Sequence, residues 1–237
     1  MKILTWNILA SEWIDNKTYN TVPKSIRCNR TIRLDSILKY IFLHEASVIM
    51  LQEVMLQEYN KIVATLQNLY IISPLIRIHW SINKNNSGNV TLFKKTDFSE
   101  KQMKHVSLPF GLQTECLYKN KLVHVFNVHF TDKSSQERYK QLGSIMPLLQ
   151  EASNCIIGGD FNHQYSSNTR FYNIPNYTIH NTNCPTYYIE RKMNIDNILS
   201  KGFNKTTIAK CPEYPKDMEK GFLTYGSDHL PISVEVY

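Results

Sequence analysis

The amino-acid sequence predicts an α/β fold in which two packed β-sheets are flanked by helices. Short segments rich in β-branched residues outnumber the segments with helical periodicity. Several of these short segments are almost continuously apolar, which is typical of strands in sheets covered on both faces. Together these observations indicate strands at the centre of the protein and helices on the outside.

The predicted strands are short runs bounded by polar or turn residues. KILTWNIL near the start, NCIIGGDF in the second half and PISVEVY at the end are examples. In chain order, the predicted strands span residues 2–9, 47–54, 70–80, 89–95, 121–130, 154–161, 193–199 and 231–237.

Apolar residues at the spacing of one helical face predict helices between these strands. The apolar stripes are Leu34, Ile37, Leu38, Ile41 and Phe42 in residues 31–46, Leu56, Tyr59, Ile62, Val63 and Leu66 in residues 56–69, and Leu142, Ile145, Met146 and Leu149 in residues 134–152. Ser134 and Glu137 form a capping box at the start of the last helix. Pro147 is expected to kink or shorten that helix, because proline removes a backbone donor.

Residues 1–237 are predicted to form a single domain, because no internal repeat, low-complexity tract or long linker divides them. The hydrophobic fraction of 42% is sufficient for a core. Lys and Arg exceed Asp and Glu by 27 to 20, which gives a formal charge of +7 and a pI near 9.0. This excess favours an anionic partner such as a phosphate backbone, although a similar excess also serves solubility.

The cysteines indicate an intracellular protein with reduced thiols. Cys28, Cys116, Cys155, Cys184 and Cys211 are odd in number and never spaced as CxxC, so neither a zinc site nor a disulfide framework is expected. The first ten residues do not resemble a signal peptide, and no apolar run approaches the roughly 20 residues that span a bilayer. We expect a soluble protein of the cytoplasm or nucleus, without a membrane or an obligatory protein partner.

Polar residues lie within or at the end of several predicted strands. They are Asn7, Glu53, Asp160, Asp196 and Asp228. A buried and isolated charge or amide costs several kcal/mol unless it is paired or bound to a cation. If these strand ends converge, they form a site.

Two further pairs place polar side chains on one face of a strand. Asp160 and Asn162 are two residues apart, so in an extended chain both leave the same face while Phe161 points to the other. Asn127 and His129 share a face in the same way. The spacing therefore predicts polar pairs on one side of a sheet.

Each of these residues also has a structural interpretation when it is taken alone. Asn7 could cap a strand end, and Asp160 after two glycines could be a turn residue. Asp196 could form a surface ion pair with Arg191 or Lys192, which contributes little to stability. Only the joint occurrence of the polar residues favours a functional site.

Six segments together resemble the endonuclease/exonuclease/phosphatase superfamily. They occur in the order of the family and extend from residue 5 to residue 229. Each segment alone is a weak signal, whereas six in order with suitable strand context are a strong one. The segments are TWNIL with Asn7, MLQEV with Glu53, NVHF with His129, GGDFN with Asp160 and Asn162, NIDNIL with Asp196, and GSDH with Asp228 and His229.

The resemblance implies the fold of pancreatic DNase I, a four-layer sandwich of two packed, mostly antiparallel β-sheets flanked by helices. It also implies hydrolysis of a phosphoester with Mg²⁺, for which Mn²⁺ could substitute. Glu53 corresponds to the carboxylate that anchors the metal, with Asn7 nearby and Asp228 as a further acidic group that helps to hold it. A hard divalent cation prefers such oxygen ligands.

The remaining motif residues correspond to catalytic and substrate-binding positions of the family. Asp160 matches the residue that orients or deprotonates the attacking water, and Asn162 is the amide beside it. His229 would donate to a nonbridging phosphate oxygen, with Asp196 setting its tautomer. His129 matches a phosphate-contacting position on a neighbouring strand.

The resemblance leaves more than one substrate class open. WNILA followed by Arg30 and Arg33 is most similar to the deadenylase and nocturnin group, which favours RNA. Leu9 stands where abasic-site endonucleases carry an acid, and NIDNIL differs from the segment of inositol phosphatases. The short chain and PTYYIERKMNIDNIL resemble tyrosyl-DNA phosphodiesterases, the second candidate. An inactive relative that only binds nucleic acid is a third.

Overall fold

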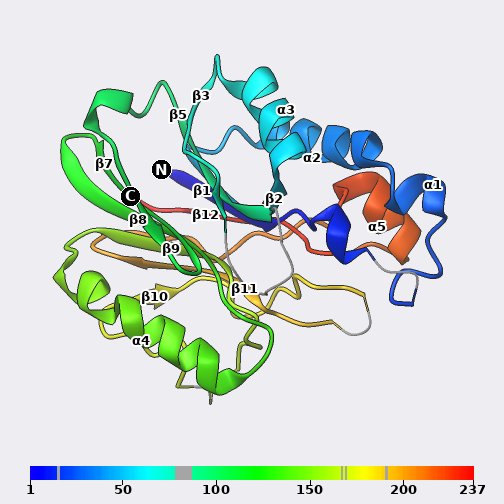
Figure 1. Ribbon diagram of the computed structural model, residues 1–237. Coiled ribbons are helices and arrows are strands. Elements are labelled where there is room, and N and C mark those ends of the chain that lie inside the picture. Colours follow the sequence, from blue (N-terminus) through cyan, green and yellow to red (C-terminus); the bar gives the residue numbers. More distant parts are fainter. Residues whose placement is uncertain (15–16, 78–86, 167, 169, 190–191) are drawn as a thin grey trace.

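Two β-sheets pack face to face at the centre of the protein, and helices cover both outer faces (Figure 1). The computed structural model describes residues 1–14, 17–77, 87–166, 168, 170–189 and 192–237. Within those residues each sheet has six strands. The predicted four-layer α/β sandwich is therefore confirmed.

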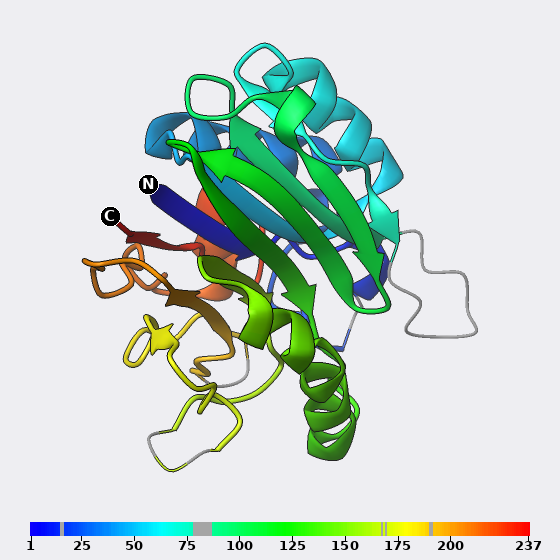
Figure 2. The same ribbon diagram turned by 90° about the vertical axis from the view of Figure 1, so that its left-hand side faces the viewer.

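The first sheet has the strand order β12-β1-β2-β5-β3, with β4 also paired to β5. Strands β1 and β2 are parallel, and the other neighbours are antiparallel. The strands are β1 (Lys2–Asn7), β2 (Val48–Met55), β3 (Tyr70–Ile72), β4 (Ile76–Arg77), β5 (Ser87–Lys94) and β12 (Ile232–Glu235). Because β12 pairs with β1, the two ends of the chain lie close together (Figure 2).

The second sheet has the order β10-β11-β9-β8-β7-β6. Here β8 and β9 are parallel, and all other neighbours are antiparallel. The strands are β6 (Lys104–Leu108), β7 (Gly111–Tyr118), β8 (Lys121–His129), β9 (Cys155–Asp160), β10 (Thr178–Ile179) and β11 (Asp196–Lys201). Each parallel pair is joined by a helical crossover, as parallel pairing requires.

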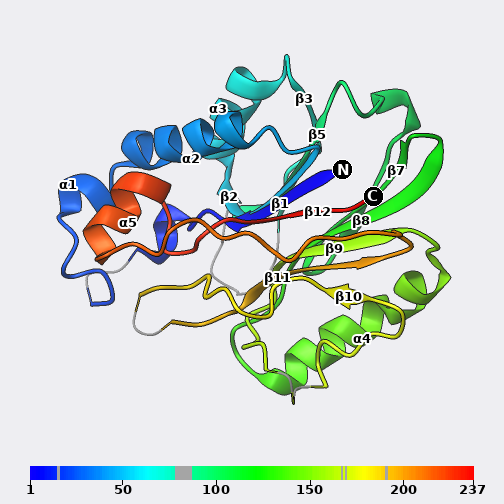
Figure 3. The same ribbon diagram turned by 180° about the vertical axis from the view of Figure 1, so that it is seen from behind.

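Helices α2 and α3 cover the first sheet, α5 packs against α2 and α1 at one end of it, and α4 covers the second sheet (Figures 1 and 3). The three predicted helices are confirmed as α2, α3 and α4. Ser134 caps α4 by accepting the Glu137 N–H, and the helix continues through Pro147 rather than stopping there. The helices are α1 (Lys24–Arg27), α2 (Arg30–His44), α3 (Leu56–Leu66), α4 (Ser135–Glu151) and α5 (Met218–Tyr225), with one-turn helices η1 (Ser11–Trp13) and η2 (Glu100–Gln102).

The structure corrects some of the predicted elements. Phe42 and Leu56 were assigned to buried stripes but are exposed. The predicted strand 70–80 is broken into β3 and β4 on either side of Pro74, which lacks a backbone donor for a central ladder, and its residues 78–80 lie outside the described residues. Strands β6, β7 and β10 and helices α1 and α5 are not predicted from the sequence. Polar residues obscure the alternation of β6 and β7, β10 has only two residues, and α1 and α5 are too short for a periodic pattern.

Alternate residues of each central strand face opposite layers of the molecule. In β1, Ile3 packs in the core between the two sheets, whereas Leu4 and Trp6 pack beneath the helices. Gly158 in β9 allows the sheets to approach closely, because a Cβ there would lie 2.2 Å from Met50 Cε of the opposite sheet. The space between the sheets is therefore filled by apolar side chains over most of its length.

Towards one end, this apolar core gives way to a buried amide network centred on Asn127. The Asn127 Nδ2 donates to the carbonyl oxygens of Leu51 and Val90, at 3.1 and 2.9 Å, across the gap between the sheets. Its Oδ1 accepts from Gln52 Nε2 at 2.8 Å and from Asn89 Nδ2 at 3.0 Å. The network fixes β8 against β2 and β5 next to the polar strand ends.

Two remaining sequence-based expectations can be compared with the structure. All five cysteines lie in described residues, and the structure has each of them as a free thiol. Among the described residues, no helix is both long and apolar enough to cross a membrane.

Candidate active site

The predicted polar strand ends converge at one end of the space between the sheets. In the second sheet, His129 at the end of β8 is in register with Asp160 at the end of β9, and Asp160 is in register with Asp196 at the start of β11. Strand alternation directs these three side chains towards the first sheet. Asn7 ends β1 on the opposite side of the gap.

Glu53 reaches this place only because the β2 backbone departs from regular geometry. Strand alternation would direct its side chain to the helix side, together with Leu51. The register with β5 shifts between Leu51 and Val54, and Glu53 has a left-handed backbone with φ of 58°. Such strain is often found at functional sites, and here it turns the carboxylate of Glu53 into the site.

The Asn7 amide links the carboxylates of the two sheets. Its Nδ2 donates to Glu53 Oε1 at 2.8 Å and to Asp160 Oδ2 at 3.0 Å. Its Oδ1 accepts the Leu9 N–H at 3.0 Å. Asn7 therefore does more than cap a strand end, because it holds Glu53 and Asp160 in a fixed relation.

Asp160 and Asn162 both line the site, as predicted, but the chain between them is not extended. Asp160 Oδ1 accepts the Asn162 N–H at 2.8 Å, and Asn162 has a left-handed backbone with φ of 48°. The Asn162 Nδ2 donates to the Phe130 carbonyl oxygen at 2.9 Å, while Phe161 packs in the core beneath α4. Strand alternation places Asp160 at the cavity, and the tight turn that follows places Asn162 there.

His229 and Asp196 form a buried, hydrogen-bonded pair. His229 Nδ1 lies 2.8 Å from Asp196 Oδ2, and the side chains are only 6% and 1% exposed. Burial alone would lower the pKa of His229, but the carboxylates of Asp196, Asp228 and Asp160 raise it well above 6.5. The ionic partner of Asp196 is thus His229. Of the alternatives, Lys192 stacks on the Tyr214 ring and Arg191 lies outside the described residues.

Asp160 Oδ2 is faced by two imidazole rings. His229 Nε2 lies 3.8 Å from this oxygen, and His129 Nε2 lies 3.7 Å from it. Burial, followed by the neighbouring charge of Asp196, raises the pKa of Asp160, and the two histidines and Asn7 partly oppose this shift. Asp160 is therefore a carboxylate with increased proton affinity.

Asp228 enters the site from the loop after α5. Its Oδ2 accepts the Tyr19 hydroxyl at 2.8 Å, and burial raises the pKa of Asp228. Burial and Asp228 also raise the pKa of Tyr19, so the phenol stays protonated as the donor. Arg33 ties this loop to the end of β1, because its guanidinium donates to the carbonyl oxygens of Gly226 and Ile8 at 2.6 and 2.8 Å.

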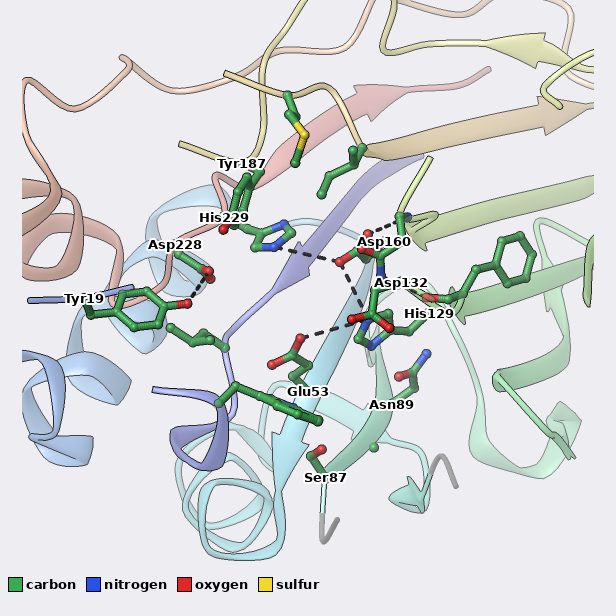
Figure 4. A pocket seen from close by; sticks show the side chains of 17 residues that line it. Tyr19, Glu53, Ser87, Asn89, His129, Asp132, Asp160, Tyr187, Asp228 and His229 are labelled. Atoms are coloured by element: carbon green, nitrogen blue, oxygen red, sulfur yellow. Dashed lines mark hydrogen bonds and ion pairs between the residues drawn. The ribbon is translucent and has the colours of Figure 1, made fainter. Parts of the chain in front are cut away.

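These side chains line a cavity of about 370 Å³ that opens to solvent (Figure 4). Glu53, His129, Asp160, Asp228 and His229 face into it. Asn162 also lines it, whereas Asn7 and Asp196 lie behind and hold the lining residues by hydrogen bonds. The structure therefore brings all eight predicted site residues together. Their individual catalytic roles remain predictions.

The donor set fits a hard divalent cation. Four carboxylates, those of Glu53, Asp160, Asp196 and Asp228, face two imidazoles, which leaves excess negative charge in a partly buried cavity. One ligand atom each of Asp160, Asp196 and His229 lies within 4.8 Å of the others, but His229 Nδ1 already bonds to Asp196. Glu53 and Asp228 offer oxygen ligands at the cavity, the type that Mg²⁺ prefers.

Several lining residues were not identified from the sequence. Tyr19, Trp13, Asn89, Asp132 and Tyr187 all line the cavity. Tyr187 lies in the PTYYIERKMNIDNIL segment, and its ring centroid is 5.2 Å from that of His229. Tyr19 and Trp13 follow β1 in an irregular segment, where periodicity gives no signal. Their placement depends on contacts with residues far along the chain.

Comparisons with known proteins agree with this geometry. The sequence profile of the Endonuclease/Exonuclease/phosphatase family matches residues 4–229. No curated protein sequence matches the chain.

Solved structures share the fold at low sequence identity. Truncated Caenorhabditis elegans TDP2 is 16% identical with a TM-score of 0.70, over 100% of this chain and 97% of that chain. ANGEL2, described as a 2′,3′-cyclic phosphatase, is 16% identical with a TM-score of 0.73, over 99% and 94%. A conserved protein of unknown function from Enterococcus faecalis V583 is 17% identical with a TM-score of 0.74, over 100% and 99%.

Proposed function

The chain belongs to the endonuclease/exonuclease/phosphatase family, and we propose that it is a Mg²⁺-dependent phosphodiesterase. It would hydrolyse phosphoester bonds at the ends of nucleic acids, with RNA as the favoured substrate. Mn²⁺ is expected to substitute for Mg²⁺. The observation that carries this proposal is Asp160, a buried carboxylate at the cavity with an imidazole nitrogen 3.7 Å away on one side and another 3.8 Å away on the other. This arrangement suits attack of water on an anionic phosphoryl group.

Asp160 is the proposed general base. A raised pKa makes its carboxylate a stronger proton acceptor, and Asn7 holds one of its oxygens in place. A water molecule bound to Asp160 transfers a proton to the carboxylate while its oxygen forms a bond to phosphorus. The bond from phosphorus to the leaving oxygen breaks on the opposite side.

His229 is the proposed donor to the phosphoryl oxygen whose charge grows during this step. Because Asp196 engages Nδ1 and neighbouring carboxylates raise the pKa of the ring, Nε2 carries a proton and points towards the cavity. His129 and Asn162 line the same cavity and would contact the remaining phosphate oxygens. The donors therefore surround one position in front of Asp160.

Glu53 and Asp228 are the residues that would hold the metal ion, whereas Asn7, the third predicted ligand, lies behind the cavity and orients Glu53. Bound there, a divalent cation would shield the negative charge of the phosphoryl group. Glu53 is oriented for this role from two sides, since Asn7 donates to Oε1 and the Ala10 N–H donates to Oε2 at 2.8 Å. The Tyr19 hydroxyl orients Asp228 in the same manner.

RNA is the preferred substrate because the WNILA segment resembles the deadenylase group. A 5′-tyrosyl-DNA phosphodiesterase is the second candidate, which the similarity to TDP2 structures over the whole chain supports. An inactive nucleic-acid-binding relative is the third, but the completeness of the hydrogen-bonded site argues against it.

A substrate panel distinguishes these candidates. End-labelled RNA, DNA and 5′-tyrosyl DNA would be incubated with Mg²⁺ or with EDTA, with Asp160→Asn as the inactive control. We expect Mg²⁺-dependent shortening of RNA that exceeds release of tyrosine from DNA. Faster processing of tyrosyl DNA would select the second candidate, and binding without any product would select the third.

A further inference from the structure

An exposed tryptophan lies at the edge of the cavity. Trp13 in η1 is 46% exposed, although tryptophan is usually largely buried in soluble proteins. It lines the same cavity as Glu53 and His229. An exposed indole next to a catalytic cavity is a surface on which a flat ring can stack.

The backbone that presents Trp13 is held by the active site itself. The Ala10 N–H donates to Glu53 Oε2 at 2.8 Å, and the Trp13 N–H donates to the Ala10 carbonyl oxygen at 2.9 Å. Arg33 donates to Ser11 Oγ at 3.4 Å and to the Ile8 carbonyl oxygen at 2.8 Å. The indole is therefore carried on a short, anchored turn whose position is set relative to Glu53.

The two oxygens of Glu53 are bonded to different parts of the site. Oε1 faces Asn7, which also holds Asp160, whereas Oε2 faces Ala10 at the start of the turn. The turn that carries Trp13 and the amide that holds Asp160 are thus bonded to different oxygens of Glu53. Phosphoryl transfer proceeds roughly in line, so the leaving group departs on the side opposite to the water at Asp160.

We propose that Trp13 is a stacking platform for the nucleobase of the nucleotide on the leaving side of the scissile bond. This inference rests on the proposed phosphodiesterase function. The net charge of +7 favours a polyanion, and the apolar residues Tyr187, Met193 and Ile195 line another part of the cavity. Stacking on an aromatic side chain tolerates any base, so Trp13 would provide affinity for nucleic acid without strict sequence preference.

The test uses oligoribonucleotides that carry an abasic ribose either on the leaving side or on the other side of the scissile bond. For the wild-type enzyme we expect loss of the leaving-side base to lower kcat/KM about 10-fold or more. Trp13→Ala should lower kcat/KM for the complete substrate by a similar factor and abolish the difference between complete and leaving-side abasic substrates. Trp13→Phe should retain part of the difference between complete and leaving-side abasic substrates.

A matched control is Phe42→Ala on α2, because Phe42 is also 46% exposed and is not among the residues that line the cavity. This variant should leave kcat/KM unchanged for every substrate. The inference is overturned if Trp13→Ala keeps the wild-type ratio of kcat/KM between complete and leaving-side abasic substrates. It is also overturned if the variant instead removes the effect of the base on the other side of the scissile bond, or if it lowers activity only on 5′-tyrosyl DNA. If the wild-type enzyme cleaves no substrate, the proposed function itself fails.

Binding provides a second readout that does not depend on turnover. In the Asp160→Asn background, a phosphorothioate-linked dinucleotide should quench tryptophan fluorescence, and the quench should be lost when Trp13→Phe is added. Of the other two tryptophans, Trp6 is fully buried and should not respond, and Trp80, which lies outside the described residues, is replaced by Phe in every protein of this assay. A quench that persists without Trp13 would contradict the stacking site.

Discussion

Asp196 and His229 are predicted to act in catalysis as one unit. Four proteins test this prediction: the wild type, His229→Ala, Asp196→Ala and the double variant. Asp196 Oδ2 accepts from His229 Nδ1 at 2.8 Å, and this bond leaves Nε2 as the donor to phosphate. Without the imidazole, Asp196 has no donor to orient, so its removal from His229→Ala should have little further effect.

The size of the effect follows from the hydrogen bond that is lost. Removal of one preorganised donor to a developing oxyanion lowers kcat by about 10²–10³, or about 2.7–4 kcal/mol. We therefore expect this loss in His229→Ala and in the double variant, and the kcat values of these two proteins should agree within about twofold. Asp196→Ala should be less damaged, because the imidazole remains but its tautomer and orientation are no longer set.

The assay is single-turnover hydrolysis of the best substrate at saturating Mg²⁺. Breaking a buried charge pair also costs about 3–5 kcal/mol of stability, so circular dichroism must confirm that each variant is folded. Asp196→Asn, which keeps the shape of the side chain, serves as the second variant if Asp196→Ala unfolds. Multiplicative losses in the double variant would show that Asp196 acts independently of His229 and would refute this reasoning.

Three further predictions concern the metal, the network and the pH dependence. Glu53→Gln should abolish most Mg²⁺-dependent turnover and the Mg²⁺-induced rise in Tm, whereas wild-type turnover would exclude the proposed metal site. Asn127→Ala should lower the free energy of unfolding in urea by about 3 kcal/mol, because it removes the buried hydrogen bonds of the Asn127 amide to Gln52, Asn89 and the carbonyl oxygens of Leu51 and Val90, and a loss below about 1 kcal/mol would contradict this. The pKa of His229 is raised in the folded protein, so protonation of this residue stabilises the fold. The contribution is fully present below about pH 6.5 and is lost as the pH rises through the raised pKa. In EDTA, Asp196→Asn should therefore lower the free energy of unfolding more at about pH 6 than at about pH 9. Equal losses at the two pH values would contradict the charge pair of Asp196 and His229.

The fold class and the membership of the site were predictable because they depend on local patterns. Side chains alternate between the two faces of a strand, and in β1, β8 and β9 this places Asn7, His129 and Asp160 on the faces that meet. Charged or amide residues at the ends of apolar runs need partners, so their convergence could be expected. The motif segments then identified which of these residues belong together.

Other parts of the site depend on contacts that no local pattern encodes. The left-handed backbone of Glu53 and the register shift beside it reverse the direction that alternation predicts for its side chain. Tyr19 is placed by its hydrogen bond to Asp228, which is 209 residues further along the chain, and Trp13 by the turn that Glu53 holds. Strands β6 and β7 carry polar residues that weaken their pattern, and their structure depends on pairing of β7 with β8 and of β6 with β7.

The central claim is that these strand ends form a metal-dependent phosphodiesterase in which Asp160 activates water. The most direct measurement compares kcat and KM of the wild type and Asp160→Asn on the RNA substrate, with Mg²⁺ and with EDTA. Since the amide keeps the shape but removes the proton acceptor, kcat should fall at least about 10²-fold with little change in KM, and EDTA should abolish wild-type turnover. Equal rates for the two proteins, a loss confined to KM, or turnover that persists in EDTA would contradict the claim.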